Sequence, residues 1–437
     1  KNGLSRSRTR RGPYSSTPAL NATGAVPPPS APRTGPGAPA VTTSDDSAMW
    51  SEVGGSGLQL LMRENDPVPG ISGALVASFG YGSYATATTG VGTGEAILAI
   101  KMKGTTTDSA LLRHSITGPA ASTVSIVARE KAPAPGTAEV FGPLHSTLGA
   151  ATRMDTLGNI VFEAQIKPSG KFGIWYQPVS GSLAKVVTTS ETAPGTSSAT
   201  YSALEMPSMG SAGTFAFRGV LNTDGDNTAN DKNDGIWRGT LAGGVTPVIR
   251  RGDPALPGMP VGSKVGNLWN GWLNPNNRGA GRGWAATARD GISPFPADTY
   301  GIYTDIGGTL RLLISVNDSA PGIAGATHAS LDHPVVSGAS GGPNGYLAYI
   351  GTVSGGGTTA ANNKGIWRST NGGAPVLVLR TGDSMSTSQG SKTVANIDLP
   401  GSGMDIRPWE LPVLDNTGRL LIYVTYTDGT SAQVIAP

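Results

Sequence analysis

Short apolar stretches separated by turn-forming residues run through the chain from residue 44 to its C-terminal end. Residues 160–164 (IVFEA) and 420–424 (LLIYV) are two such stretches, and each follows a polar turn, at 155–158 (DTLG) and 415–418 (DNTG). The stretches are short for helices and show the period-2 alternation of half-buried strands, while Asn, Asp, Gly and Pro supply the turns. The pattern predicts an all-β protein.

A strand that ends in arginine and leads into a Pro-Gly turn recurs along the chain. Clear copies are LLMR at 60–63 before PVPG at 67–70, and IVAR at 126–129 before PAPG at 133–136. The glycines that close the turns, Gly70, Gly136, Gly195, Gly258 and Gly322, lie 66, 59, 63 and 64 residues apart. A nearly fixed spacing of this kind indicates tandem structural repeats.

A second motif, Gly-Ile followed by an aromatic residue, precedes each later turn. It occurs at Gly173-Ile174-Trp175, Gly235-Ile236-Trp237, Gly301-Ile302-Tyr303 and Gly365-Ile366-Trp367, and Trp50 stands at the same place in the first unit. Together with the alternating strand that opens each unit, the motifs divide a repeat into four short strands. Four strands per repeat is the composition of a propeller blade.

The number of repeats predicts the architecture. Full units cover residues 71–136, 137–195, 196–258, 259–322 and 323–388, and half units remain at 44–70 and 389–437. Because the halves are complementary, we predict that both termini join in one blade and close a six-bladed β-propeller, which removes free sheet edges. Segments 47–52 and 431–435 compete for the third strand of this closing blade, and the sequence leaves that choice open.

The positive charge of the chain is concentrated at its N-terminal end. The formal charge is +3, from 32 Lys and Arg and 29 Asp and Glu. Residues 1–43 hold six basic side chains, Lys1, Arg6, Arg8, Arg10, Arg11 and Arg33, and no acidic one, so the remainder comes to −3 (26 minus 29). This Pro-rich segment has few large apolar side chains, and we predict an extended arm before a propeller domain at 44–437.

The composition excludes several classes of protein. The chain has no cysteine, so it has no disulfide, thiolate nucleophile, Cys-ligated metal or covalent haem. Charged residues make up 14% of the chain, against about 25% in an ordinary soluble domain, which excludes a coiled coil or a highly charged disordered chain. No apolar run approaches the roughly 18 residues of a transmembrane helix.

Taken together, the motifs resemble the tandem-repeat proteins that many bacteria export, often with varied C-terminal sorting anchors (the choice-of-anchor tandem-repeat type). The resemblance rests on Gly-Ile-Trp, on the Leu-Val-x-Arg-x-Gly-Asp-Pro-x-Pro-Gly turn and on the Asp/Asn-x-x-Gly strand opener, and it covers residues 44–437. It implies export, to the periplasm or the extracellular space, and a propeller-like repeat. That family has no assigned catalytic residues, so the resemblance transfers no active site.

Metal-binding patterns are weak in this sequence. No pair among the histidines, His114, His145, His328 and His333, has metal-ligand spacing on a helix, and we interpret His328 and His333 as ordinary loop histidines rather than a metal pair. Asp224, Asp226, Asn230 and Asp231 offer hard oxygen ligands for calcium within one loop, but the EF-hand spacing fails. A solvated turn is the favoured interpretation, a calcium loop is the alternative, and no other cofactor is expected.

Some aromatic and arginine side chains recur at a fixed place in each unit, and other aromatic side chains fall outside the repeat. Trp50, Trp175, Trp237 and Trp367 hold a fixed place in each unit, which favours packing between blades over a sugar-binding ring. Arginines that recur with an aspartate three residues later indicate a hydrogen-bonded corner. Trp269, Trp272 and Trp409 fall outside the repeat, on predicted connections, where exposed aromatics would serve a partner or glycan surface.

The function predicted from these features is non-catalytic. No nucleophile elbow or phosphate loop is present, and we expect a structural or accessory subunit that docks on a larger assembly. Its partner-binding residues are Arg6, Arg8, Arg10, Arg11, Tyr14 and Arg33 of the arm. Other protein subunits or an anionic membrane surface suit this arm, and nucleic acid fits poorly because the remainder is slightly acidic. The alternatives are an exported carbohydrate-binding propeller and a hydrolase or lyase working in the central channel.

Overall fold

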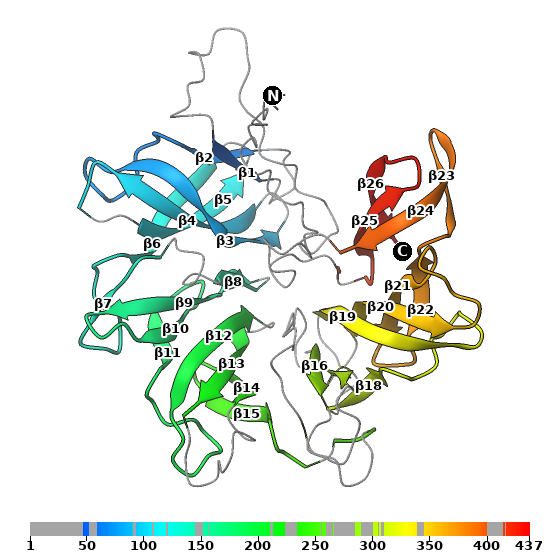
Figure 1. The fold of residues 1–437 in the computed structure, drawn as a ribbon. Coiled ribbons are helices and arrows are strands. Elements are labelled where there is room, and N and C mark those ends of the chain that lie inside the picture. Colours follow the sequence, from blue (N-terminus) through cyan, green and yellow to red (C-terminus); the bar gives the residue numbers. More distant parts are fainter. Residues whose placement is uncertain are drawn as a thin grey trace, which may run out of the picture.

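The computed structural model is built from antiparallel strands arranged around a centre (Figure 1). It describes residues 47–51, 59–90, 93–106, 109–118, 121–144, 152–155, 157–209, 213–222, 234–254, 256–258, 265, 285–289, 300–304, 306, 310–338, 345–399, 414–415 and 417–437. Every named element within these ranges is a strand, which confirms the predicted all-β class. The described residues therefore include no helix long and apolar enough to cross a membrane.

Five sheets of four or five strands form the blades of a β-propeller-like arrangement (Figure 1). The first contains β3 (Leu75–Gly90), β4 (Thr93–Lys103), β5 (Ser109–Gly118) and β6 (Ala121–Arg129). The second contains β7 (Val140–Phe141), β8 (Thr152–Met154), β9 (Ile160–Lys167), β10 (Phe172–Gln177) and β11 (Ala184–Thr188). The third contains β12 (Tyr201–Met209), β13 (Thr214–Leu221), β14 (Asp234–Thr240) and β15 (Gly244–Arg250).

The two remaining blades lie in the C-terminal part of the chain. One contains β19 (Ala326–Gly338), β20 (Gly345–Gly355), β21 (Lys364–Thr370) and β22 (Val376–Arg380). The last, which we call the terminal sheet, contains β23 (Ser384–Thr387), β24 (Gly390–Asp398), β25 (Leu420–Tyr426) and β26 (Ser431–Ala436). Sequential strands are neighbours in every blade except the second, where β7 and β8 both pair with β9.

Two smaller sheets accompany the blades, and the predicted six-bladed closure is not confirmed. One holds β16 (Ala285–Arg289), β17 (Tyr300–Thr304) and β18 (Arg311–Ser315), and the other holds β1 (Ala48–Ser51) and β2 (Gln59–Arg63). Within the described ranges β1 pairs with β2, β25 pairs with β26, and no pairing joins these two sheets. Segment 431–435 thus takes the place beside β25, because β26 forms a tight hairpin with it.

A bulge recurs in the outer strand of six sheets, opposite a strand that in four of them carries the Gly-Ile-aromatic motif. The register shifts between Met49 and Trp50, Leu111 and Leu112, Ile174 and Trp175, Ile236 and Trp237, Ile302 and Tyr303, and Ile366 and Trp367. A bulge inserts one residue, increases the local twist and redirects the side chain that follows. These six sheets therefore share one backbone irregularity at the same place.

Apolar side chains are buried between neighbouring sheets. One core cluster joins Val161 and Ile174 of the second sheet to Phe217 and Trp237 of the third. Another joins the sheet β19–β22 to the terminal sheet, for example through Ile350 and Ile422. Because each strand alternates its side chains between two faces, a blade can pack against both neighbours at once. The low charge content of the chain follows from this two-sided burial.

Candidate functional site

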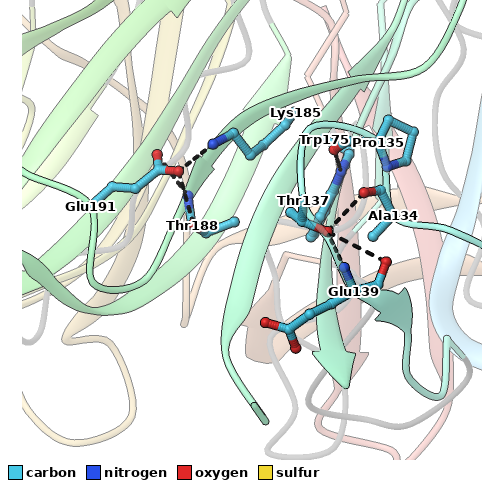
Figure 2. A network of polar contacts seen from close by, with 8 residues as sticks. All are labelled: Ala134, Pro135, Thr137, Glu139, Trp175, Lys185, Thr188 and Glu191. Atoms are coloured by element: carbon cyan, nitrogen blue, oxygen red, sulfur yellow. Dashed lines mark hydrogen bonds and ion pairs between the residues drawn. The ribbon is translucent and has the colours of Figure 1, made fainter. Parts of the chain in front are cut away.

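The repeated tryptophans link each blade to the turn that leads into it. In three blades the indole Nε1 donates a hydrogen bond to a proline carbonyl oxygen. Trp175 donates to Pro135 at 3.1 Å, Trp237 to Pro194 at 3.0 Å, and Trp367 to Pro321 at 2.9 Å. Figure 2 shows the first of these contacts. All three indole rings are fully buried. The predicted role as packing between blades is confirmed for these three, whereas Trp50, included in the same prediction, is only partly buried.

Two more rings surround the tryptophan in these blades. Phe217 is stacked on Trp237 with an interplanar angle of 17°, and Tyr201 meets it edge-on at 79°. Trp367 has the same two kinds of neighbour: Tyr349 is stacked on it at an interplanar angle of 12°, and His328 meets it edge-on at 73°. For Trp175 the stacked ring is Phe162, at 23°, and the edge-on ring is Phe141, at 71°. An imidazole in one blade thus replaces an aromatic hydrocarbon or phenol ring in the others. Such pairs add about 0.5–1.5 kcal/mol beyond burial.

The two histidines whose side chains are described are core residues, and the loop position predicted for His328 is wrong, because His328 lies within β19 and packs on Trp367. His114 and His328 are both fully buried. Removal from water lowers the pKa of each imidazole to about 4. Within the described residues, neither ring nitrogen of His114 has a hydrogen-bond partner, while Nε2 of His328 lies 3.4 Å from the hydroxyl oxygen of Tyr349. Both rings are therefore neutral near pH 7.

The recurring aspartates cap the turns that follow the outer strands. The backbone N–H of Arg63, Arg250 and Arg380 donates to a carboxylate oxygen of the aspartate three residues later, at 2.7, 2.6 and 2.8 Å. In the second sheet Glu191 takes this role for the N–H of Thr188 and also contacts Lys185 (Figure 2). The predicted corner is confirmed, with the backbone as its principal donor, since Nε of Arg63 and Arg380 is 3.9 Å from the carboxylate.

Arginine side chains in the third strand reach into the next blade. Arg113 donates from Nη2 to the carbonyl oxygen of Gly158 at 2.8 Å and from Nη1 to that of Val179 at 3.2 Å. Arg368, at the matching position of β21, donates to the carbonyl oxygen of Gly418 at 2.6 Å. Burial lowers the pKa of Arg113 and raises that of Glu95 beside it. These arginines bridge blades rather than bind an anion.

The acceptor glycines belong to the Asp-x-x-Gly turns that open the second strand. Oδ1 of Asp155 accepts the N–H groups of Leu157 and Asn159, both at 2.9 Å. Gly158 adopts a φ of 87° in this turn, which favours glycine. Asp415 and Gly418 repeat the arrangement in the terminal sheet, where hydrogen bonds from Thr417 and Arg419 lower the pKa of Asp415 against the opposing effect of burial. The opener motif is thus a turn rather than a ligand site.

One buried ion-pair network lies within the third sheet. Arg218 of β13 contacts Oε2 of Glu205 at 2.5 Å and Oδ2 of Asp234 at 3.2 Å. The side chains of Arg218 and Asp234 are 7% and 3% exposed, so removal of the arginine would leave a buried carboxylate. Burial of this kind requires paired charges. The network fixes the register of three neighbouring strands.

The terminal sheet differs from the other blades on one side. We call this side the terminal face; it carries Asn396, Asp398, Tyr423, Gln433 and Ile435, which share it through cross-strand pairing. Tyr423 and Ile435 are 39% and 42% exposed. At the places of Tyr423 and Gln433, the preceding blade carries Ile350 and Ile366, which are 4% and 0% exposed. The terminal face is therefore more polar and more open than its counterpart.

A polar cluster lies beside the exposed tyrosine. Asp398 pairs with Tyr423 across β24 and β25, which places their side chains next to each other on one face. Nζ of Lys364 donates to Asp398 at 2.8 Å and to Asn396 at 3.0 Å. The group combines an aromatic surface with an ammonium, a carboxylate and an amide. Among the described residues this is the best candidate for a binding surface.

The residues singled out from sequence as partner, glycan or calcium sites all lie outside the described residues. They are Arg6, Arg8, Arg10, Arg11, Tyr14 and Arg33 of the arm, the aromatics Trp269, Trp272 and Trp409, and the loop residues Asp224, Asp226, Asn230 and Asp231. These assignments stay predictions. In the part that the structure describes, no group of three or more His, Cys, Asp or Glu side chains is placed to hold a metal ion.

The terminal face was missed by the sequence reasoning, although a signal existed. Residues 420–424 were interpreted as an ordinary alternating strand of the closing blade. Comparison of the last unit with the one before it shows tyrosine and glutamine in the places of Ile350 and Ile366. The place of Gln433 is held by isoleucine in the second, third and β19–β22 sheets (Ile174, Ile236, Ile366), so the glutamine is the signal of a face that is not built for burial. The place of Tyr423, by contrast, already varies among Glu163, Arg218 and Ile350.

The chain belongs to a family of unknown function (DUF7453), whose model matches residues 9–436. A search of the curated proteins gave no match. Among solved structures, an oligogalacturonate lyase in complex with manganese is 13% identical with a TM-score of 0.37, over 78% of this chain and 73% of that one. A triple arginine mutant of AofleA from Arthrobotrys oligospora is 13% identical with a TM-score of 0.29, over 85% and 89%.

A viral protein gives a third similarity. The hemagglutinin-neuraminidase ectodomain of parainfluenza virus 5 is 8% identical with a TM-score of 0.28, over 85% of this chain and 83% of that one. At these identities no activity or ligand is transferred from any of the three. The family match in turn assigns no function, and it does not name the repeat type predicted from the motifs.

Proposed function

We propose that the protein is a non-catalytic accessory subunit, exported by a bacterium, that docks on a larger protein assembly. The observation that carries this proposal is the terminal face, where Tyr423 is 39% exposed although its place is buried in the second, third and β19–β22 sheets, and where Ile435 beside it is 42% exposed. Aromatic and aliphatic side chains with a polar surround are the usual centre of a protein interface. The repeated Trp, Arg and Asp side chains are already engaged in contacts between and within blades.

The partner surface is proposed to be acidic next to an apolar patch. The arm of residues 1–43 carries six basic side chains and no acidic one, so an acidic surface would attract it and favour association. The arm leads into β1, and β1 lies on the same side of the ring as β26 (Figure 1). One partner can then receive both the charged arm and the terminal face. The six-bladed ring closed by both termini is also kept as a proposal, and it is developed below.

The docking proposal is tested by measured stoichiometry. The tagged full chain is purified from its source cells beside a variant without residues 1–43, the double variant Tyr423→Ser with Ile435→Ser, and the matched variant Val376→Ser. Val376 is 65% exposed but lies on another sheet. A partner in fixed stoichiometry that is lost in the first two variants and kept in the third supports the proposal. A partner that all forms retain equally contradicts it.

A carbohydrate-binding function is the second candidate, favoured by the surroundings of Tyr423. An exposed ring beside Asp398, Asn396 and Lys364 offers a stacking surface together with donors and acceptors for hydroxyl groups. The test is a glycan array read with the wild type and with Tyr423→Ser. A saccharide signal that disappears in the variant supports glycan binding, and an array without signal above background contradicts it.

A further inference from the structure

Trp50 differs from the buried tryptophans although it occupies the same place in its strand. It pairs with Leu60 of β2 next to a bulge in β2, as Trp367 pairs with Leu377 next to a bulge in β22. Yet Trp50 is only partly buried, and its indole nitrogen is enclosed without a hydrogen-bond acceptor among the described residues. A buried donor without an acceptor costs about 1–3 kcal/mol. The motif in β1 is thus present without the contact that it makes in three other blades.

β26 presents the converse situation. It lies beside β25 in the third-strand position, but Val434 stands where the repeat has a tryptophan, since Val434 pairs with Ile422 as Trp367 pairs with Tyr349. None of its six residues is buried, whereas residues 365–367 of β21 all are. In the part of the chain that the structure describes, β26 is also an edge strand without a fourth strand beside it. Its hold on β25 is therefore weaker than that of a repeat strand.

We propose that β1 and β26 are alternative partners of β25, and that replacement of β26 by β1 closes the ring and covers the terminal face. In the closed state β24, β25, β1 and β2 form one four-stranded blade. In the open state, β26 completes the terminal sheet and the terminal face is exposed. This inference rests on the proposed docking function, because it makes the docking surface available in only one of the two states.

The repeat fixes the register of the closed state. In the blade β19–β22, Ile350 pairs with Ile366. Tyr423 and Met49 occupy these two places in β25 and β1, so exchange places Met49 opposite Tyr423. The next residue, Trp50, then faces the apolar core between the terminal sheet and β19–β22. Burial of a tryptophan in place of a valine favours this exchange.

In the closed state the sheet β3–β6 would cover the terminal face. β1 and β2 pack through Met49, Leu61 and Met62 on the sheet β3–β6. When β1 joins β25, it brings this sheet against the side of β24 and β25 that carries Asp398 and Tyr423, while Ile435 leaves this side together with β26. A partner that needs this face binds only the open state and shifts the population toward it. The arm leads directly into β1, so a partner that holds both the arm and the terminal face keeps β1 away from β25.

The exchange can be read by disulfide trapping because the chain contains no cysteine of its own. The double variant Met49→Cys with Tyr423→Cys reports the closed state, since directly opposed residues on antiparallel strands are within disulfide range. The matched variant Tyr423→Cys with Gln433→Cys reports the open state, because these residues pair in the structure. Both double variants are oxidised in the full chain. The variant Met49→Cys with Tyr423→Cys is also oxidised in a chain that lacks residues 431–437.

The expected result is an intrachain disulfide from both pairs in the full chain, with the yield for Met49→Cys and Tyr423→Cys at least threefold higher after removal of residues 431–437. Two results overturn the inference. One is no disulfide from this pair in the shortened chain while the matched pair is fully oxidised. The other is a disulfide that joins two chains, which assigns the exchange to a dimer.

Hydrogen exchange provides a measurement that needs no cysteine. In the shortened chain, amide exchange across residues 47–51 should slow at least tenfold, and Trp50→Ala should abolish that slowing. Unchanged exchange overturns the inference. The docking proposal and the strand-exchange proposal can fail independently. If the closed state is trapped but Tyr423→Ser leaves partner binding unchanged, docking alone is contradicted. If the partner binds through the terminal face and no strand exchange is detected, the exchange alone is contradicted.

Discussion

The indole nitrogen of Trp237 donates a hydrogen bond to the carbonyl oxygen of Pro194 at a distance of 3.0 Å. Pro194 belongs to the turn that leaves the outer strand β11 and leads into β12, so the contact ties a third strand to the passage between two sheets. Two other blades contain the same contact, so three of the blades share this link.

Loss of this hydrogen bond should destabilise the fold measurably. Trp237→Phe keeps an aromatic ring but leaves the carbonyl of Pro194 without its donor, and we expect a loss of about 2 kcal/mol in the free energy of unfolding. Trp50→Phe is the matched control, because the indole nitrogen of Trp50 has no acceptor among the described residues. Urea unfolding measures both. Equal losses in the two variants would contradict a structural role for the indole contact.

The arginine contact between blades gives a second prediction. Arg113→Met removes the donors to the carbonyls of Gly158 and Val179, and hydrogen bonds to charged groups contribute roughly 1.5–3 kcal/mol each. We expect a loss of about 3 kcal/mol, measured by urea unfolding. The control is Lys101→Met, since Lys101 is exposed on the neighbouring strand. A loss below that of the control would show that Arg113 does not hold the blades together.

The buried histidines predict a stability that falls in mildly acidic solution. At pH values well above 6.5, His114 and His328 are neutral in the folded and the unfolded chain. Between pH 6.5 and about 4 the unfolded chain binds protons that the folded chain does not, because the folded pKa values are about 4. Stability should decline across this range by up to about 3 kcal/mol for each histidine. Thermal unfolding from pH 8 to pH 4 measures the decline.

The contribution of one histidine can be separated by a substitution that the repeat itself suggests. Phe141 occupies in the second blade the edge-on position that His328 occupies beside Trp367. His328→Phe should therefore fold normally, leave stability at pH 8 nearly unchanged, and flatten the decline toward pH 4 by about half. An undiminished decline would show that His328 does not titrate as its burial implies.

Alanine substitution at two glycines with similar backbone angles distinguishes the cost of a steric clash from the cost of backbone strain. Gly418 and Gly429 have φ values of 86° and 81°, so alanine is strained at both. A Cβ at Gly418 would lie 2.6 Å from Cε1 of Tyr346, whereas nothing lies within 4 Å at Gly429. We expect Gly418→Ala to destabilise by at least about 1 kcal/mol more than Gly429→Ala in urea unfolding. Equal losses would assign the whole effect to backbone conformation.

Much of the fold could be predicted because the repeat constrains it. Spaced Pro-Gly turns and the Gly-Ile-aromatic strand indicated four-stranded units, and in the first, third and β19–β22 sheets the described strands follow them. The number of blades could not be fixed in the same way. Residues 47–52 and 431–435 both fit the third-strand position, and the choice depends on contact energies between the two ends of the chain rather than on local pattern.

The candidate site was less predictable than the fold. Reasoning from unusual residues pointed to Trp269, Trp272 and Trp409 and to a basic arm, all outside the described residues. The terminal face is built from residues such as Tyr423 and Gln433 that are ordinary in a strand. Their importance depends on which side of the sheet is left uncovered, and that is a property of tertiary packing.

The most direct test of the account is hydrogen exchange of the chain alone and in complex with the partner that co-purifies with it. Docking through the arm and the terminal face predicts that binding slows amide exchange in residues 1–43 and in β25 and β26, and leaves β12 and β19 unchanged. Protection confined to strands that line the centre of the ring, with none in the arm or the terminal sheet, would contradict it.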